Sequence, residues 1–186
     1  MGNRQWATGF TLIEMLTTVA FLVIVLGLMV SLARDVRSRS ADRLTKDILR
    51  KLDVLVDQYR DKALPNIPRK DRRKFPVVHP FIGNGPFDES QLQANALANN
   101  KELVRTLKMY IDLSAGPLNE LSIANYNEVT IVDAWGSPIV YMPQQHPAVG
   151  MAATNSSFFF SAGPDRKYLT RSDNLYSYET PGAEEP

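Results

Sequence analysis

The residue best placed to do chemistry in this chain is Glu14, the only charged side chain in a 24-residue apolar run from Phe10 to Ala33. As an α-helix this run is about 36 Å long, enough to cross the hydrocarbon core of a bilayer. A carboxylate in such a segment costs about 2.5–3.5 kcal/mol at the bilayer centre and less near its edge, so it usually has a partner. We therefore expect a membrane span in which Glu14 meets a positive group.

Gly9, Phe10 and Glu14 together resemble the processing site of type IV pilin-like precursors, the pilins and pseudopilins. The resemblance implies that a prepilin peptidase removes residues 1–9 as a leader by cutting after Gly9, and then methylates the amino group of Phe10. Glycine suits the position before the cut because it has no Cβ to clash in a tight protease cleft. The resemblance also implies an assembly role, in which Glu14 of one subunit pairs with the Phe10 amine of its neighbour.

Two other interpretations of the apolar run remain. A plain signal anchor with an incidental acid has the same length and composition. A cleaved secretory signal fits less well, because its apolar core usually has about 7–15 residues and because no small-x-small cleavage site follows the run.

A second resemblance lies nearer the carboxyl terminus. Residues 133–141 read Asp-Ala-Trp-Gly-Ser-Pro-Ile-Val-Tyr, residues 159–165 read Phe-Phe-Ser-Ala-Gly-Pro-Asp, and an Asp-Asn pair follows at 173–174. These stretches are similar to the carboxy-terminal sheet of the major pseudopilin of type II secretion systems. The chain departs from that family at Ser31, where proline is usual, and in a longer stretch, an insert around residues 65–127.

In that family the loop after the last long strand binds calcium through acidic side chains and backbone carbonyls. The resemblance carries this role to Asp165, Asp173 and Asn174, which supply three or four of the six to eight oxygen ligands that Ca²⁺ takes. Three cations in the same loop oppose such an ion: Arg166, Lys167 and Arg171. The residues leave two interpretations open, a calcium site and a plain turn.

Side chains for catalysis are scarce. The chain has no cysteine, and its two histidines, His79 and His146, each precede a proline with no ligand spacing nearby. No phosphate loop, nucleophile elbow or zinc motif occurs in the sequence. We therefore expect a structural protein rather than an enzyme, and a membrane-anchored enzyme with an unrecognised site is the alternative.

The element that must position Glu14 is a long helix from Phe10 to Ala63, which Pro65 ends. Residues 10–33 form its transmembrane part, and residues 34–64 form an amphipathic part. Apolar residues recur there at three- and four-residue steps and form one stripe. The stripe comprises Val36, Ser40, Leu44, Ile48, Leu52, Leu55, Val56 and Tyr59. We expect it to pack on the head.

Residues 65–186 form the predicted globular head. A proline-rich loop spans Leu64–Glu89, and a second helix is predicted from about Glu89 to Leu113, with an interruption allowed for at Asn99-Asn100. Short β-like runs follow at 129–132, 139–142, 157–161 and 174–178. Alternation across the sheet places one or two rings of Phe158–Phe160 on the long helix. The predicted fold class is α+β and pilin-like, a long amino-terminal transmembrane and amphipathic helix packed on a small antiparallel β-sheet head.

Charge is uneven, although the net charge is only +1. Residues 34–74 carry 14 Lys/Arg against 7 Asp/Glu, and residues 75–186 carry 6 against 12. A solvated basic stalk below an acidic head accounts for this pattern, and so does attraction between stalks and heads of successive subunits. The densest basic stretch, residues 69–74, is either a solvated loop or a contact for acidic lipid, DNA or a neighbouring head. No aromatic residue interleaves with it, which argues against nucleic-acid binding.

Two signals disagree about orientation. Arg4 precedes the apolar run, whereas Arg34, Arg37 and Arg39 follow it, and the positive-inside rule would place the head in the cytoplasm. The precursor resemblance implies a bacterial inner-membrane protein with a single span, its amino terminus in the cytoplasm and its head in the periplasm. We expect this second orientation. The alternative is a cytoplasmic head that binds nucleic acid through residues 69–74.

These observations predict a structural subunit of a membrane-rooted pseudopilus, which assembles after prepilin-peptidase cleavage and drives protein export by type II secretion. The partners that the resemblance implies are copies of the chain itself, minor pseudopilins, an inner-membrane assembly platform and the prepilin peptidase. A type IV pilin or minor pilin for adhesion, motility or DNA uptake has the same stalk and is the alternative.

Overall fold

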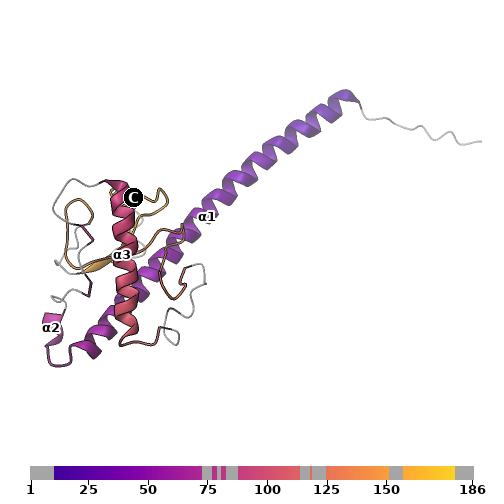
Figure 1. Cartoon of the computed structure of the whole chain (residues 1–186). Coiled ribbons are helices and arrows are strands. Elements are labelled where there is room, and N and C mark those ends of the chain that lie inside the picture. The colour runs from indigo at the N-terminus through magenta and orange to yellow at the C-terminus, as the bar shows by residue number, and fades with distance from the viewer. Residues whose placement is uncertain are drawn as a thin grey trace, which may run out of the picture. The chain divides into compact units, whose positions relative to one another are not determined.

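The computed structural model describes residues 11–72, 77–78, 81–82, 88–113, 118, 125–150 and 157–178, without the side chains of residues 69–70. In chain order the elements are α1 (Leu12–Ala63), α2 (Arg69–Arg72), α3 (Glu89–Lys108), β1 (Val140–Met142), β2 (Phe158–Ser161) and β3 (Leu175–Tyr176) (Figure 1). The chain divides into two compact units, Met1–Arg39 and Ser40–Pro186, and α1 contributes residues to both.

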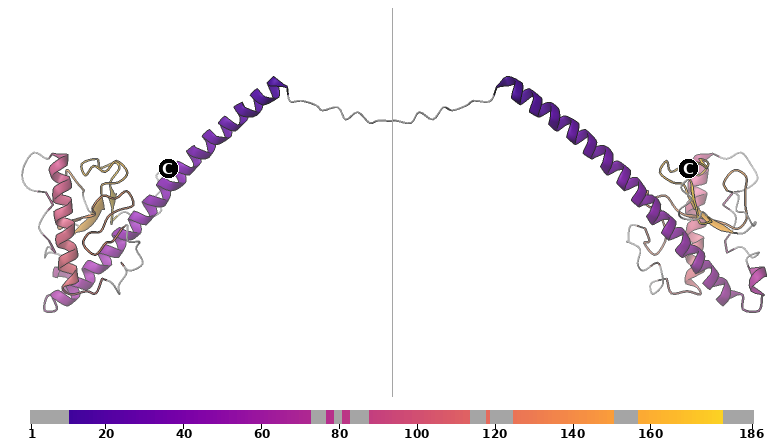
Figure 2. Two further views of the ribbon diagram at one scale, coloured as in Figure 1. Left: turned by 45° about the vertical axis from the view of Figure 1, so that its right-hand side comes forward. Right: turned by 180° about the vertical axis from the view of Figure 1, so that it is seen from behind.

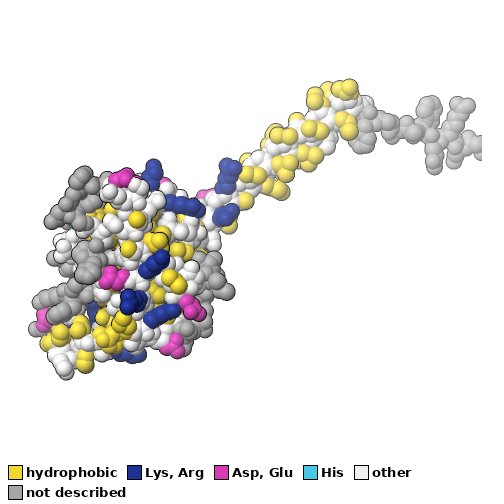
Figure 3. All heavy atoms as spheres, in the orientation of Figure 1, with side chains coloured by type: hydrophobic (Ala, Val, Ile, Leu, Met, Phe, Trp, Pro, Cys, Tyr) yellow, Lys and Arg dark blue, Asp and Glu magenta, His cyan; other side chains and the backbone are white. Residues whose placement is uncertain are grey.

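In the first unit α1 exposes its apolar side chains. From Leu12 to Ala33 every residue is exposed except Val25, which is half-buried. Figure 3 shows hydrophobic side chains over the visible face of this segment. By length and composition, α1 is the one helix in the described part of the chain that is long and apolar enough to cross a membrane. An apolar surface of this extent is unstable in water, so the segment requires lipid or protein around it.

In the second unit one face of α1 is buried in the head. The buried residues of this face are Thr45, Ile48, Leu49, Leu52, Leu55, Val56 and Arg60. The predicted apolar stripe is therefore confirmed between Ile48 and Val56. It was wrong at Val36, Ser40 and Leu44, which are all exposed, while Thr45 next to Leu44 is fully buried. Thr45 takes this place because its hydroxyl accepts a hydrogen bond from the backbone N–H of Ala134 at 3.2 Å.

The three strands form one antiparallel sheet in the order β1-β2-β3. Its register pairs Tyr141 with Phe159, and Phe160 with both Val140 and Tyr176. The head is thus α+β, with a small antiparallel sheet beside two helices. The views of Figure 2 show α3 next to the sheet.

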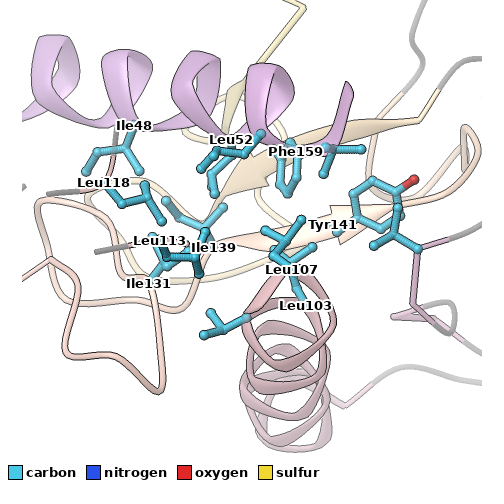
Figure 4. Packing of buried hydrophobic residues seen from close by; sticks show 14 of the residues in the cluster. Ile48, Leu52, Leu103, Leu107, Leu113, Leu118, Ile131, Ile139, Tyr141 and Phe159 are labelled. Atoms are coloured by element: carbon cyan, nitrogen blue, oxygen red, sulfur yellow. The ribbon is translucent and has the colours of Figure 1, made fainter. Parts of the chain in front are cut away.

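Alternation along β2 divides the core into two clusters, because successive side chains of a strand point to opposite faces. Phe159 joins α1 and α3 in the first cluster, together with Ile48, Leu52, Leu103 and Leu107 (Figure 4). Phe158 and Phe160 join a second, aromatic-rich cluster with Phe81, Tyr168 and Tyr176. The prediction that at least one ring of this triplet packs with the long helix is confirmed for Phe159.

Several predicted boundaries hold and others do not. Helix α1 ends at Ala63, and its last turn closes where the N–H of Leu64 donates to the carbonyl of Arg60 at 3.0 Å. The second helix was predicted to reach Leu113, but α3 ends at Lys108, since the N–H of Met109 turns back to the Thr106 carbonyl.

Two further predictions need correction. Residues 129–132 form no strand and make only two isolated bridges, Tyr126 with Ile131 and Val132 with Pro138. The loop predicted at Leu64–Glu89 contains the one-turn helix α2, in which the N–H of Asp71 donates to the carbonyl of Pro68 at 2.8 Å.

Candidate functional site

The first candidate site is the amino-terminal end of α1. Gly9 and Phe10, the predicted processing residues, lie outside the described part of the chain. Glu14 lies in the first turn of α1. Its Oε2 accepts hydrogen bonds from the backbone N–H and the hydroxyl of Thr11, both at 2.8 Å, and its own N–H donates to Thr11 Oγ1 at 3.4 Å. This reciprocal arrangement is a capping box with Thr11 as the N-cap residue.

The capping box gives the acid a place within its own helix. A carboxylate in the first turn is favoured by the helix dipole, and it occupies a backbone N–H that has no partner inside the helix. The hydroxyls of Thr17 and Thr18 also donate to main-chain carbonyls one turn earlier, at 2.6–3.0 Å. Of the two Glu14 oxygens, Oε2 alone has a partner among the described residues. Oε1 is therefore open to a second donor.

The second candidate site is the set of residues that carry the carboxy-terminal motif, and Asp133 is its centre. Asp133 is 1% exposed. Its Oδ1 accepts the backbone N–H groups of Trp135 and Ser137 at 2.9 and 2.8 Å, and its Oδ2 accepts the hydroxyl of Ser161 at 2.6 Å. One buried carboxylate therefore joins the turn at residues 133–137 to strand β2.

Two glycines of the motif are required by backbone geometry. Gly136 has φ +88° and Gly163 has φ +68°, both in the region that favours glycine. Around Gly136 nothing lies within 4 Å of a Cβ added to the backbone, but at Gly163 that atom would lie 1.9 Å from the carbonyl oxygen of Asp173. The N–H of Gly163 donates to Ser161 Oγ at 3.0 Å. Gly163 thus brings the two ends of the 163–174 loop into backbone contact.

Burial also raises the pKa values of two groups in this network, Asp133 and Tyr168. Burial raises the pKa of Asp133 above its ordinary value of 3.8, and the hydrogen bonds that the carboxylate accepts oppose the rise. Burial likewise raises the pKa of the Tyr168 hydroxyl, and the negative charges of the nearby Asp133 and Glu89 carboxylates raise it further. The Tyr168 hydroxyl donates to the carbonyl of Pro138, and its backbone N–H donates to Glu89 Oε1, both at 2.8 Å. The network ties α3, β2 and two loops together.

The predicted calcium ligands lie on the 163–174 loop. Asp165 and Asp173 are half-buried, and Asp165 Oδ1 accepts the N–H of Lys167 at 2.8 Å. Asn174 is 4% exposed, and its amide donates to the carbonyl of Tyr168 at 3.0 Å. Its Oδ1 is buried without a hydrogen-bond partner. This orphaned oxygen fits a cation ligand, although no group of three His, Cys, Asp or Glu residues in the described part of the chain could hold a metal.

The two asparagines at which the second helix was expected to weaken are buried anchors. Asn99 Nδ2 donates to the carbonyl of Tyr141 at 3.2 Å, and Asn99 Oδ1 accepts the N–H of Tyr141 at 2.9 Å. Asn100 accepts the N–H of Ile131 at 2.8 Å and donates to the carbonyls of Ile131 and Ile139 at 2.8 and 2.6 Å. The sequence feature that could have pointed to these roles was the pair of adjacent amide side chains next to the apolar face of a predicted helix.

Arg60 is a third buried polar residue whose role was not predicted from the sequence. It is 4% exposed near the end of α1, and its guanidinium donates to the hydroxyls of Tyr141 and Ser157 at 2.9 and 2.8 Å. It also pairs with Asp57 at 3.2 Å. These contacts fix the last turns of α1 to β1, so Arg60 has a structural role.

The remaining candidates in the described part of the chain make local contacts. In the basic stretch 69–74, the Arg72 side chain bonds to the carbonyls of Ile67 and Pro65 and to Asp61. His146 Nδ1 accepts the N–H of Ala148 at 3.2 Å within a turn. His79 and residues 73–74 lie outside the described part of the chain.

Comparisons with known proteins add no relative: no family model, curated protein or solved structure matches this chain significantly.

Proposed function

We propose that this chain is a pseudopilin-like structural subunit of a membrane-rooted filament. In this proposal the peptidase-processed chain stands in a bacterial inner membrane with its head in the periplasm. Copies of the chain pack side by side through the apolar part of α1, and the growing fibre pushes secreted protein outward. The role is structural rather than catalytic.

The observation that carries the proposal is the position of Glu14. It is the only charged side chain of the exposed apolar segment of α1, it lies in the first turn, and its Oε1 is open to a second donor. A lone acid at such a place costs free energy in lipid unless a cation meets it. Cleavage after Gly9 would free the α-amino group of Phe10 on a neighbouring chain. This group would be positively charged and would lie at about the same depth in the membrane as Glu14.

The carboxy-terminal motif favours a secretion pseudopilus over the alternative pilins. Its residues converge on one network around Asp133, with Ser161 on β2 and Gly163 beyond it. Because the matching stretches contact one another in the head, they support the resemblance together rather than as separate chance matches.

Processing and assembly can be tested together by co-expressing the chain with a prepilin peptidase. Mass spectrometry is expected to find a mature terminus at Phe10, methylated, in the wild type and in Glu14→Ala. Filaments in shear fractions are expected from the wild type and to be lost in Glu14→Ala, because the neighbour's amine then has no counter-charge. Thr18→Ala, which removes another polar group of the same segment, is the control and should assemble normally.

An uncut chain would contradict the precursor assignment. Normal filaments from Glu14→Ala would instead remove the charge pairing while leaving the processing intact.

We further propose that the 163–174 loop binds calcium through Asp165, Asp173 and Asn174. The orphaned, buried Oδ1 of Asn174 supports this assignment. A ligand that binds only the folded state stabilises it, by about 2.7 kcal/mol at a hundredfold excess over Kd. Millimolar CaCl₂ is therefore expected to raise the thermal midpoint of the wild type by several degrees, and EDTA should reverse the rise.

The matched variants for the calcium test remove two carboxylates each. Asp165→Asn/Asp173→Asn is expected to lose the response, and Glu102→Gln/Glu128→Gln should keep it. An equal response in both double variants, or none in the wild type, would leave these residues as plain turn residues.

A further inference from the structure

Three arginines follow the apolar segment within the first unit. Arg34, Arg37 and Arg39 are all exposed, and the only acid among residues 34–39 is Asp35, which pairs with Arg39 at 3.2 Å. Neither Arg34 nor Arg37 has a hydrogen-bond or ion-pair partner among the described residues. At about 100° per residue the three side chains spread over more than half of the helix circumference. They form a partial collar of cations, which we call the arginine collar.

The depth of the arginine collar follows from helix geometry. Counted from Leu12 at 1.5 Å per residue, its Cα atoms lie about 33 to 40 Å along the helix. The hydrocarbon core of a bilayer is about 30 Å thick, and the headgroup layers bring the total to about 40–45 Å. When Leu12 stands at one face of the core, the headgroup layer of the other face covers about 30–37 Å. Arg34 lies within this layer, and Arg37 and Arg39 lie at or just beyond its outer edge, from which their long side chains reach the phosphates.

We propose that the arginine collar binds the phosphate groups of anionic phospholipids. This inference rests on the proposed function only through the membrane span. Guanidinium groups are suited to the task, because they present several N–H donors in a planar fork that matches phosphate oxygens. Long arginine side chains also extend along the helix while their heads stay in the polar layer.

A lipid is the occupant that the structure favours over a protein carboxylate. The arginine collar is continuous with an exposed apolar segment that is long enough to cross a bilayer, and it faces several directions at once. A single docked acidic protein surface would reach one side of the helix. Bilayer headgroups surround a spanning helix on every side, so they reach all three arginines.

The lipid preference can be measured on the full chain in nanodiscs of equal phosphatidylcholine and phosphatidylglycerol. Native mass spectrometry of the ejected protein counts the lipids that stay bound. Each cation near an anionic surface changes the affinity about fivefold, so the wild type is expected to retain phosphatidylglycerol over phosphatidylcholine by about fivefold or more. Addition of 0.5 M NaCl before ejection should reduce this ratio.

Two triple variants of equal charge separate the arginine collar from net charge. Arg34→Gln/Arg37→Gln/Arg39→Gln is expected to bring the ratio close to one. The control, Arg50→Gln/Lys101→Gln/Arg105→Gln, removes three exposed cations of the second unit and should keep the wild-type ratio. Glutamine keeps the helix propensity of arginine and lysine, so folding is not at issue.

Equal ratios in the wild type and the collar variant would overturn the inference, and so would a ratio near one in both. Insertion of every variant into nanodiscs tests the span separately. Filament formation by the collar variant tests assembly separately, so a failed lipid preference and a failed pseudopilus are distinguishable.

Discussion

At the scale of single residues, Asp133 shows how a short motif can organise the packing of a head. Its two oxygens accept three hydrogen bonds inside the head. A buried carboxylate with this many donors is costly to form and costly to disturb.

The raised pKa of Asp133 gives a prediction with a definite sign. The folded state holds the proton more tightly than the unfolded state, whose value is close to 3.8. The contribution of this group to stability is therefore full below pH 3.8 and is lost as the pH rises through the folded-state pKa. We expect the difference in unfolding free energy between the wild type and Asp133→Asn to decrease with rising pH in that window, as measured by urea denaturation from pH 3 to 7.

Glu128→Gln is the control for the pH series, because it removes a carboxylate that is 78% exposed. Its difference from the wild type should change little over the same window. A difference between the wild type and Asp133→Asn that grows with pH would contradict the expected direction.

Residue roles were predictable from the sequence where type and spacing are enough. Glu14 stands out because charge is rare in apolar helices. Its cap by Thr11 was not among the predictions, although the S/T-x-x-E pattern indicates it. The roles of Asn99 and Asn100 were not predictable, because their partners are main-chain groups more than 30 positions away. Asparagine usually destabilises a helix. Here the hydrogen bonds of Asn99 and Asn100 to distant main-chain groups offset that cost.

At the scale of elements, the contact of α3 with Ile131 and Ile139, just before β1, is the one most open to test. Asn100→Ala removes three hydrogen bonds and leaves the N–H of Ile131 and the carbonyl of Ile139 without their partner. Each unsatisfied buried group costs about 1–3 kcal/mol. We expect the variant to lose about 2–4 kcal/mol of unfolding free energy in urea.

Asn95→Ala is the matched control, since Asn95 lies on the same helix and is exposed. It should be neutral or slightly stabilising, because alanine has the higher helix propensity. Equal losses in the two variants would contradict a specific stabilising role for the buried hydrogen bonds of Asn100.

Element ends were predictable where local chemistry sets them. Pro65 sets the end of α1 near Ala63, and Glu89 begins α3 after the proline-rich stretch. Residues 129–132 have side chains typical of a strand, but they form isolated β-bridges and a hydrogen bond to the Asn100 side chain instead of a strand. A strand needs a neighbouring strand over several residues, and that information is absent from local sequence.

At the scale of the whole molecule, the two units differ in the solvent that they require. Every residue of both core clusters belongs to Ser40–Pro186, whereas the exposed apolar helix belongs to Met1–Arg39. We predict that a fragment of residues 40–186 folds as a water-soluble monomer with one cooperative urea transition. Light scattering after gel filtration and circular dichroism check the mass and the transition.

A shorter fragment, residues 64–186, is the control for the contribution of α1. It lacks five core side chains of that helix, namely Ile48, Leu49, Leu52, Leu55 and Val56. Truncation of one such side chain typically costs about 2–5 kcal/mol, so this fragment should be unfolded. Cooperative folding of the shorter fragment would contradict a core shared with α1.

The asparagine pair on α3 has a consequence for how heads can join. Strand β1 is an edge strand of the sheet. An edge strand with unpaired N–H and C=O groups can form hydrogen bonds with a strand of another chain. Here the outward groups of Tyr141 are already occupied by Asn99. Sheet extension by another chain is thereby blocked at Tyr141, so crowded copies of this head are protected from amyloid-like stacking along that edge.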